Sequence, residues 1–174
     1  MRRTGKTTLI RQLLLASDIR QQVYFDLERI DNRELFSEKN YDNIVLALAQ
    51  RGLVFSKKVL IAIDEIQLAP NLPSVVKYLY DHYNIKFVLT GSSSYYLKNC
   101  FSESLAGRKK IFEVYPLTFR ELLRCKGIEM PRVSPWEVQP FVSATYERLK
   151  PWYEEYINFG GFPFVLPIEN RERN

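Results

Sequence analysis

The sequence predicts an α/β fold in which a parallel β-sheet carries helices on both faces. Two short apolar segments, Val59–Ile63 and Phe87–Thr90, are rich in residues typical of strands that are buried on both faces. Segments with apolar residues at helical spacing separate these strands along the chain. Strands that alternate with helices form parallel sheets, because each helical crossover returns the chain to the same edge.

The predicted elements follow one another from the N-terminus. Lys6–Ala16 has apolar residues at helical spacing and is predicted to be the first helix. Val23–Leu27 is predicted to be a strand. Asp31 and Glu34 are interpreted as a capping box that opens a helical region running toward Gly52.

The strand Val59–Ile63 is followed by a helix that is predicted to start at Pro73 or Ser74. After the strand at Phe87–Thr90, residues 93–106 are expected to be mostly helical. Ile111–Tyr115 is predicted to be a third apolar strand that stops at a proline.

Thr118 and Glu121 have the spacing of a capping box, which predicts a helix that runs to about Lys126 and ends at Gly127. Three prolines between residues 128 and 140 indicate a linker. A later helix is expected to restart at Pro151 and to end before a glycine pair. We therefore expect a core at residues 1–127, a linker at 128–140 and the start of a helical C-terminal region at 141–174.

Composition excludes some functional classes. Cys100, Cys125 and His82 are the complete set of cysteines and histidines, so a metal site of the Cys/His type is not expected. Two unpaired thiols favour a reducing, cytoplasmic location. The longest apolar runs are far shorter than the about 20 residues that cross a bilayer, so no membrane role is expected. The net charge of +5 permits an anionic partner without requiring one.

The first segment that carries chemistry is Gly5-Lys6-Thr7-Thr8, which matches the end of a phosphate-binding loop. A helix N-terminus attracts phosphate through its unpaired N–H groups. Lys6 would reach the β- and γ-phosphates of a nucleotide, and the Thr7 hydroxyl would ligate Mg²⁺. Such a short match also arises by chance. The residues predicted to hold the nucleotide are Arg3, Thr4, Gly5, Lys6, Thr7 and Thr8.

Two acids, Asp64 and Glu65, directly follow the buried strand at Val59–Ile63. Ligands of open α/β sheets bind at the carboxyl ends of the strands. Asp64 would hold Mg²⁺, directly or through water, and Glu65 would orient or deprotonate an attacking water. The alternative is that both acids only pair with nearby lysines at the end of the strand.

Small polar residues follow the strand at Phe87–Thr90. Thr90 and Ser92 would contact the γ-phosphate or the water, although the same residues are ordinary in turns. Arg108 lies after the expected helix and would stabilise the charge that develops in phosphoryl transfer, in its own subunit or in a neighbour's. A surface arginine paired with an acid is the alternative for Arg108.

The order of these motifs is more informative than any one of them. A phosphate-loop ending, an acid pair after a buried strand and polar residues after another buried strand follow one another at spacings that suit one α/β sheet. Together they predict nucleotide binding.

These stretches resemble the prokaryotic AAA+-like P-loop ATPases that carry a C-terminal domain of unknown function. The resemblance implies an ATPase core with the strand order 5-1-4-3-2, and ATP with Mg²⁺ as cofactors. It covers almost the whole chain and rests on residues 2–9, 60–67, 89–94, 104–108, 116–121 and 156–163.

The resemblance also implies a strand and a loop glycine before Met1 and further chain after Asn174. On this expectation the sequence is a fragment that lacks a central strand, which would lie between the strands beginning near Phe87 and Ile111. Burial of each large apolar side chain contributes about 1.5–3 kcal/mol, so a chain without that strand is expected to fold poorly and to bind nucleotide weakly.

Four functional hypotheses remain open at this point. The first is an ATPase, which Glu65 favours because a pure binder needs no acid to activate water. The second is a nucleotide-responsive binding module with a protein client or a homo-oligomeric partner, and the third is a truncated remnant without activity. The fourth is a DNA client, contacted by Arg120, Arg124 and the basic stretch at 108–110.

Overall fold

The computed structural model describes residues 3–92, 107–130 and 140–165 of the chain. The chain forms two compact units. One comprises Lys6–Phe112, and the other comprises Glu113–Asn174 together with Arg2–Gly5. The helix expected at 93–106 and most of the expected linker at 128–140 lie outside the described residues.

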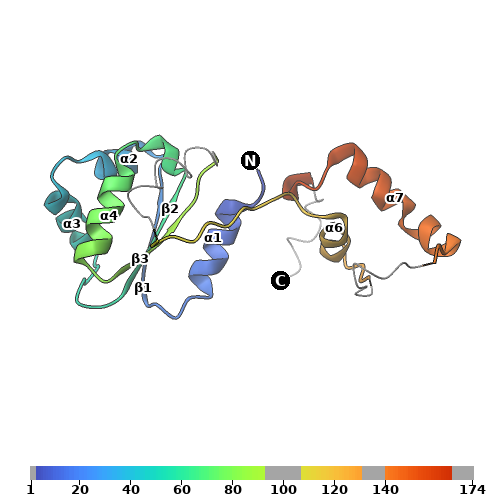
Figure 1. The fold of residues 1–174 in the computed structure, drawn as a ribbon, viewed down its shortest axis with the longest axis horizontal. Helices are drawn as coiled ribbons and strands as arrows, with labels where there is room; N and C mark the ends of the chain where they lie inside the picture. Colours follow the sequence, from blue (N-terminus) through green and yellow to red (C-terminus); the bar gives the residue numbers. More distant parts are fainter. Residues whose placement is uncertain (1–2, 93–106, 131–139, 166–174) are drawn as a thin grey trace. The chain divides into compact units, whose positions relative to one another are not determined.

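The first unit is built on three parallel strands, and the α/β fold is thereby confirmed (Figure 1). They are β1 (Gln21–Asp26), β2 (Val59–Asp64) and β3 (Ile85–Leu89), in the spatial order β1-β2-β3. Every residue of the central strand β2 is buried, as its apolar sequence predicted. The order agrees with the 4-3-2 portion of the strand order that the family resemblance implies.

Helices cover both faces of this sheet. The helices α2 (Ile30–Ser37), α3 (Tyr41–Gln50) and α4 (Leu72–His82) lie on one side, and α1 (Lys6–Leu15) lies on the other (Figure 1). A short 3-10 helix, η1 (Ile66–Leu68), joins β2 to α4.

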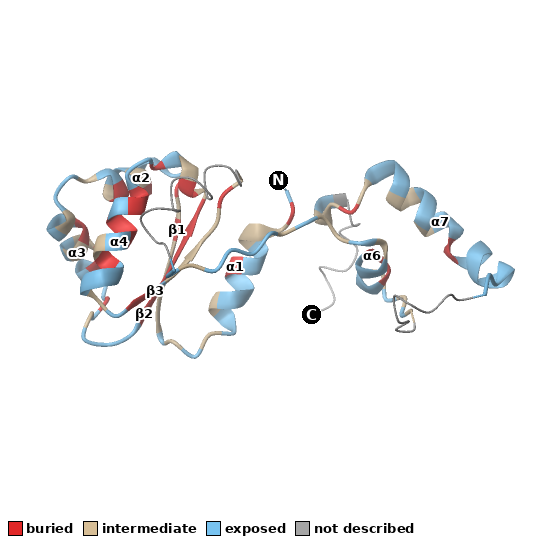
Figure 2. Cartoon of the chain, in the orientation of Figure 1, coloured by how far each residue is buried: buried red, intermediate tan, exposed pale blue. Residues whose placement is uncertain are grey.

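The two faces of β2 have different roles, because successive side chains of a strand point to opposite faces. Val59, Ile61 and Ile63 belong to the main apolar core together with buried residues of α2, α3 and α4 (Figure 2). The alternate positions, Ala62 and Asp64 among them, therefore face α1. The face that supplies most of the apolar burial is thus separate from the face that carries the charged side chain.

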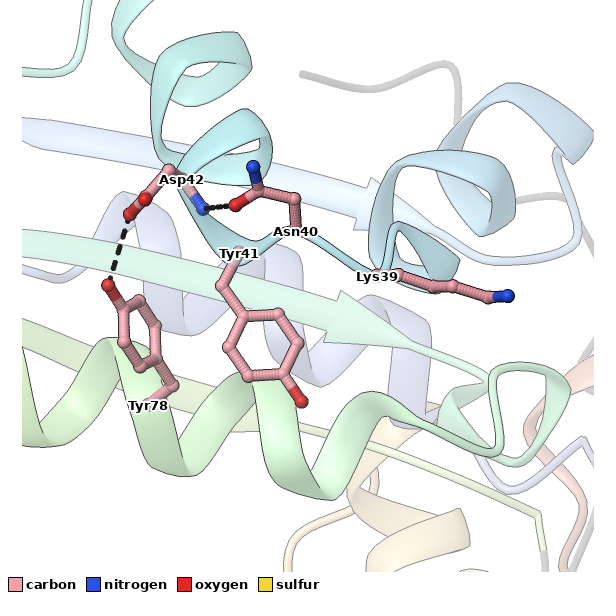
Figure 3. Close-up of a pocket in the computed structure, with 5 residues that line it drawn as sticks. All are labelled: Lys39, Asn40, Tyr41, Asp42 and Tyr78. Carbon is pink, nitrogen blue, oxygen red and sulfur yellow. Dashed lines mark hydrogen bonds between the residues drawn. The ribbon is translucent and has the colours of Figure 1, made fainter.

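Side chains of α3 and α4 also contact each other at the surface of the first unit (Figure 3). Asn40 caps α3 by accepting a hydrogen bond from the Asp42 backbone N–H at 3.0 Å. The Tyr78 hydroxyl of α4 donates to Asp42 at 3.2 Å, and the Tyr41 and Tyr78 rings pack with their centroids 5.1 Å apart. With Lys39, these residues line a shallow hollow on the surface of the first unit.

The second unit contains α6 (Phe119–Cys125), α7 (Ser143–Phe159) and a short 3-10 helix, η2 (Pro163–Val165). The capping box of Thr118 and Glu121 is confirmed. Gly127, whose backbone is left-handed with φ of +75°, follows the end of α6. Phe119 packs edge-on against Tyr153 of α7, and Lys126 pairs with Glu155 of α7 at 2.7 Å. These contacts hold α6 on α7.

The capping box expected at Asp31 and Glu34 is wrong. Helix α2 begins at Ile30 after Arg29, and Asp31 lies in its first turn. The Asp31 carboxylate pairs with the guanidinium of Arg29, the N-cap residue, at 2.8 Å, and the Arg29 side chain caps no N–H of the helix. The helical region divides into two helices because Asn40 caps a new one.

Two further predictions about elements are also wrong. Ile111–Tyr115 forms no strand, and Ile111, Phe112 and Tyr115 are exposed. A strand needs a neighbour for its ladder of hydrogen bonds, and within the described part of the chain β3 pairs with β2 alone. Helix α7 does not restart at Pro151 but runs through it from Ser143, because buried Leu149 and the ring contacts to α6 offset one lost hydrogen bond.

Gly161 allows a close backbone approach within the second unit, and its replacement by alanine should be destabilising. The Leu117 N–H donates to the Gly161 carbonyl at 2.6 Å, and a Cβ on Gly161 would lie 1.9 Å from the Leu117 carbonyl oxygen. We expect Gly161→Ala to lower the free energy of unfolding by about 2–4 kcal/mol, through steric overlap and a lost hydrogen bond.

Tryptophan fluorescence during denaturant unfolding measures this effect, because Trp152 lies on α7 of the second unit and residues 6–112 contain no tryptophan. Gly127→Ala is the control, since its Cβ would meet nothing within 4 Å and only its positive φ opposes the change, at about 1 kcal/mol. Equal effects of the two substitutions would contradict the predicted overlap.

Candidate active site

Asp64 lies at the centre of the candidate site, at the carboxyl end of β2, and only 2% of its surface is exposed. Its Oδ2 accepts hydrogen bonds from the Thr7 hydroxyl at 2.6 Å and from the Tyr24 hydroxyl at 3.2 Å. Its Oδ1 accepts from the Glu65 backbone N–H at 3.0 Å and from the Thr90 hydroxyl. Four donors from separate segments thus meet at one buried carboxylate.

The strand register explains this convergence. Asp26 pairs with Asp64 across β1 and β2, and Ile63 pairs with Leu89, so that Thr90 reaches the level of Asp64 on the other side. Thr7 arrives from the first turn of α1, which covers the same face of the sheet. All of these residues lie at the carboxyl ends of parallel strands, where α/β proteins bind ligands.

Tyr24 comes from β1, two residues before Asp26 and on the same face of the sheet. Its partner in the register is Ala62, whose methyl side chain leaves room for the ring to lean toward Asp64. The Arg11 guanidinium lies 5.9 Å from the centroid of the Tyr24 ring. Burial, and then the negative charges of Asp64 and Asp26, raise the pKa of Tyr24 to about 12. The phenol is therefore a hydrogen-bond donor at neutral pH.

Glu65 belongs to a second cluster beside the first. Its backbone is left-handed, with φ of +54°, a conformation that is uncommon for a residue with a side chain. Its carboxylate accepts from the Ser92 hydroxyl at 2.9 and 3.0 Å and from the Gln67 amide. The Ser92 N–H donates in turn to Gln67 Oε1 at 3.4 Å.

The predicted nucleotide-binding residues are divided between the two units. Lys6, Thr7 and Thr8 form the first turn of α1, whereas residues 3–5 belong to the second unit. Arg3 and Gly5 have left-handed backbones, with φ of +61° and +87°. The Thr4 hydroxyl is buried and has no hydrogen-bond partner. Turns of this kind expose N–H groups that bind anions.

The structure does not place Arg108 close to Asp64. Its guanidinium pairs with Asp81 near the end of α4. Helix α4 begins close to the carboxyl end of β2 and rises about 1.5 Å per residue, so Asp81 lies roughly 13 Å further along it. The structure thus places Arg108 at the opposite edge of the sheet.

The Thr7 hydroxyl and the Asp64 carboxylate fit a magnesium ion, which prefers oxygen ligands and is bound by few protein groups together with water and phosphate oxygens. No group of three or more His, Cys, Asp or Glu side chains that could hold a metal is found among the described residues.

Sequence reasoning missed two residues of these clusters, Tyr24 and Gln67. The alternation of Gln22, Tyr24 and Asp26 along β1 is a signal that one face of this strand carries polar groups. Gln67 directly follows the acid pair and one isoleucine, but its contact with Glu65 depends on η1 and on the left-handed turn before it.

A Gly-Lys-Thr sequence at the start of a helix, followed by a buried aspartate at the end of a strand beside it, defines a nucleotide-binding domain of the P-loop class. The family model described as the AAA domain matches residues 1–123. The chain belongs to this family.

Three curated relatives are similar along nearly the whole chain. An uncharacterized protein of Haemophilus influenzae is 26% identical over 95% of this chain and 38% of its own length. Two uncharacterized proteins of Methanocaldococcus jannaschii, MJ1637 and MJ1544, are 27% and 30% identical over 99% and 98% of this chain and 38% and 36% of their own lengths. The chain therefore spans under two fifths of the length of these relatives. No solved structure matches it.

Among the helices of the described residues, none has the length and apolar character needed to cross a membrane.

The left-handed backbone of Glu65 generates a prediction about stability. Alanine and glycine at position 65 both remove the contacts with Ser92 and Gln67, but only glycine adopts positive φ without a steric cost. We expect Glu65→Gly to be more stable to denaturant than Glu65→Ala by about 1 kcal/mol, because relief of the strain exceeds the entropy that glycine adds to the unfolded chain.

Glu38 offers the control, because its φ is −59° and its carboxylate too accepts a hydrogen bond, from the Asn40 N–H. There the order should reverse, with alanine more stable than glycine. If alanine were more stable than glycine at both positions, Glu65 would not be strained.

Proposed function

We propose that this chain is a cytoplasmic, Mg²⁺-dependent ATPase domain that binds ATP and hydrolyses it to drive a conformational change. The observation that carries the proposal is the 2.6 Å hydrogen bond from Thr7 to Asp64. It joins the first turn of α1, where phosphate would bind, to the acid at the end of β2, where a cation would bind.

In this proposal the first turn of α1, from Lys6 to Thr8, binds the phosphates, with Lys6 directed at the β- and γ-phosphates. Thr7 and Asp64 hold Mg²⁺, which would offset the negative charge of the phosphates. A hydroxyl both donates and accepts, so Thr7 keeps its hydrogen bond to Asp64 while its oxygen lone pairs stay available to the cation.

Glu65 is proposed to orient the attacking water and to take its proton. Thr90 contacts Asp64 and Ser92 contacts Glu65, although the two residues are only two positions apart after β3. A shift of this short segment would therefore change the surroundings of both acids together. We propose that Thr90 and Ser92 report the state of the nucleotide in this way.

Arg108 is proposed to separate from Asp81 and then to stabilise the charge on the transferred phosphoryl group. Both partners of this pair are partly exposed, and exposed ion pairs contribute only about 0–1 kcal/mol. Because Arg108 lies far from Asp64 within the first unit, a neighbouring copy of the chain is the proposed recipient of this arginine.

A second candidate function is a nucleotide-responsive binding module that does not hydrolyse ATP. The contacts of the Glu65 carboxylate with Ser92 and Gln67 favour it, since these donors compete with a water for the carboxylate oxygens. In either case we propose that residues 141–174 begin a C-terminal helical domain. We also propose that the conformational change acts on a bound protein or DNA client.

Binding is tested by calorimetric titration of the chain with Mg-ATP. We expect Lys6→Ala to weaken binding at least about tenfold, because a charged hydrogen bond to phosphate contributes about 1.5–3 kcal/mol. Lys77→Ala is the control, since Lys77 is exposed on α4. Absence of binding by the unsubstituted, folded chain would contradict the proposed function.

Hydrolysis is tested separately by the release of inorganic phosphate. We expect Glu65→Gln to bind Mg-ATP as the unsubstituted chain does and to hydrolyse it about 10²–10⁴-fold more slowly, because the amide cannot accept a proton. An unchanged rate would exclude Glu65 as the base, and equal binding without any hydrolysis in both proteins would favour the binding module.

A further inference from the structure

The hydrogen bonds of Asp64 leave no acceptor position of its carboxylate vacant. An ionised carboxylate has about four lone-pair positions, two on each oxygen. Thr7 and Tyr24 occupy both positions of Oδ2, and the Glu65 N–H and Thr90 occupy both positions of Oδ1. A cation, or a water bound to it, must therefore displace one of these four donors.

The four donors differ in how easily they leave. The Glu65 N–H belongs to the main chain and cannot rotate away by itself. The Thr7 hydroxyl bonds at 2.6 Å, and Thr7 is also the proposed second ligand of the cation. The Thr90 hydroxyl comes from a residue whose N–H donates to the Ile63 carbonyl of β2 at 2.9 Å, so that its main chain is fixed beside Asp64. The bond from Tyr24 is the long one, at 3.2 Å, beyond the usual 2.5–3.0 Å for two oxygens.

We propose that the Tyr24 hydroxyl occupies the acceptor position of Asp64 that a divalent cation uses, so that Tyr24 opposes cation binding until it is displaced. Tyr24 is in this view a positioning residue of the site and does not contact the reacting atoms. The inference deepens the proposed function, because it concerns the same cation site at Asp64.

The surroundings of Tyr24 suit this role. The Arg11 guanidinium lies 5.9 Å from the centroid of its ring. Asp26 lies two residues further along the same face of β1 and is in register with Asp64. A phenol that leaves Asp64 therefore remains close to a second carboxylate, so that its displacement does not require the strand to move.

The need to displace the Tyr24 hydroxyl therefore lowers the affinity of Asp64 for the cation. Removal of the hydroxyl in Tyr24→Phe leaves one lone pair of a buried carboxylate without a donor, which makes Asp64 a better ligand. We expect the dissociation constant for the cation to fall about three- to tenfold, less than the more than tenfold effect of a full hydrogen bond to a charged group, because this bond is long.

The experiment is a titration of the chain with Mn²⁺, which prefers the same oxygen ligands as Mg²⁺. Binding is followed by the loss of the electron paramagnetic resonance signal of the free ion, in the absence of nucleotide. Tyr80→Phe is the matched control, since Tyr80 is exposed on α4, and Asp64→Asn removes the proposed ligand. Tyr24→Leu is a second variant without the hydroxyl, and thermal unfolding checks that each protein is folded.

The expected result is tighter Mn²⁺ binding in Tyr24→Phe and Tyr24→Leu, unchanged binding in Tyr80→Phe and loss of this binding in Asp64→Asn. Equal or weaker binding in both Tyr24 variants would overturn the inference, because Tyr24 would then be neutral to the cation or would support it. Persistence of the binding in Asp64→Asn would also overturn it, since the cation would be elsewhere.

A second titration, with ATP in the presence and absence of Mg²⁺, separates this inference from the proposed function. Tyr24→Phe should increase only the gain in ATP affinity that Mg²⁺ provides, whereas a structural role would change the affinity under both conditions. A chain that does not bind ATP but shows the Mn²⁺ difference would refute the proposed function and retain the role of Tyr24.

Discussion

The buried carboxylate of Asp64 is the constraint on which the arrangement of the first unit depends. An ionised group that is removed from water must regain its hydrogen bonds within the protein, or the cost of burial is several kcal/mol. Asp64 regains them from α1, from β1, from the turn after β2 and from the segment after β3. The requirement to satisfy one side chain thus fixes the relative positions of four segments, and it fixes them at the edge of the sheet where a ligand would bind.

The alternation of side chains along β2 separates stability from chemistry. Val59, Ile61 and Ile63 face the apolar core formed with α2–α4, whereas Ala62 and Asp64 face α1. A substitution at one set of positions removes apolar contacts, and a substitution at the other changes the charge and hydrogen bonding of the site. Adjacent residues of the same strand therefore have different roles, and the register transmits the same division to β1, where Phe25 lies in the core and Tyr24 lies in the site.

Local patterns predicted the features that short segments determine by themselves. The apolar run of β2, the acids that follow it and the capping box of Thr118 each depend on a few neighbouring residues, and each could be predicted from the sequence. The contact of Tyr24 with Asp64 could not, because it depends on the register of two strands that are far apart in the chain. Ile111–Tyr115 has the composition of a strand, but composition does not supply the neighbouring strand that pairing requires. The sequence left open that Arg108 pairs with an acid, but it could not identify Asp81 as that acid, since the two residues lie 27 positions apart in the chain.

The left-handed turn at Glu65 resolves a conflict between the two consecutive acids. In a continued strand, Glu65 would point to the opposite face from Asp64, into the apolar core between the sheet and α4. A buried, unpaired carboxylate there would be costly. With φ of +54°, the chain instead leaves the strand at Glu65, and the side chain reaches Ser92 and Gln67 at the same edge of the sheet. The local strain, of order 1–3 kcal/mol, is the cost of keeping both carboxylates at one edge while giving each its own donors. In the proposed function this separation lets one acid hold a cation while the other orients a water, because each has its own donors.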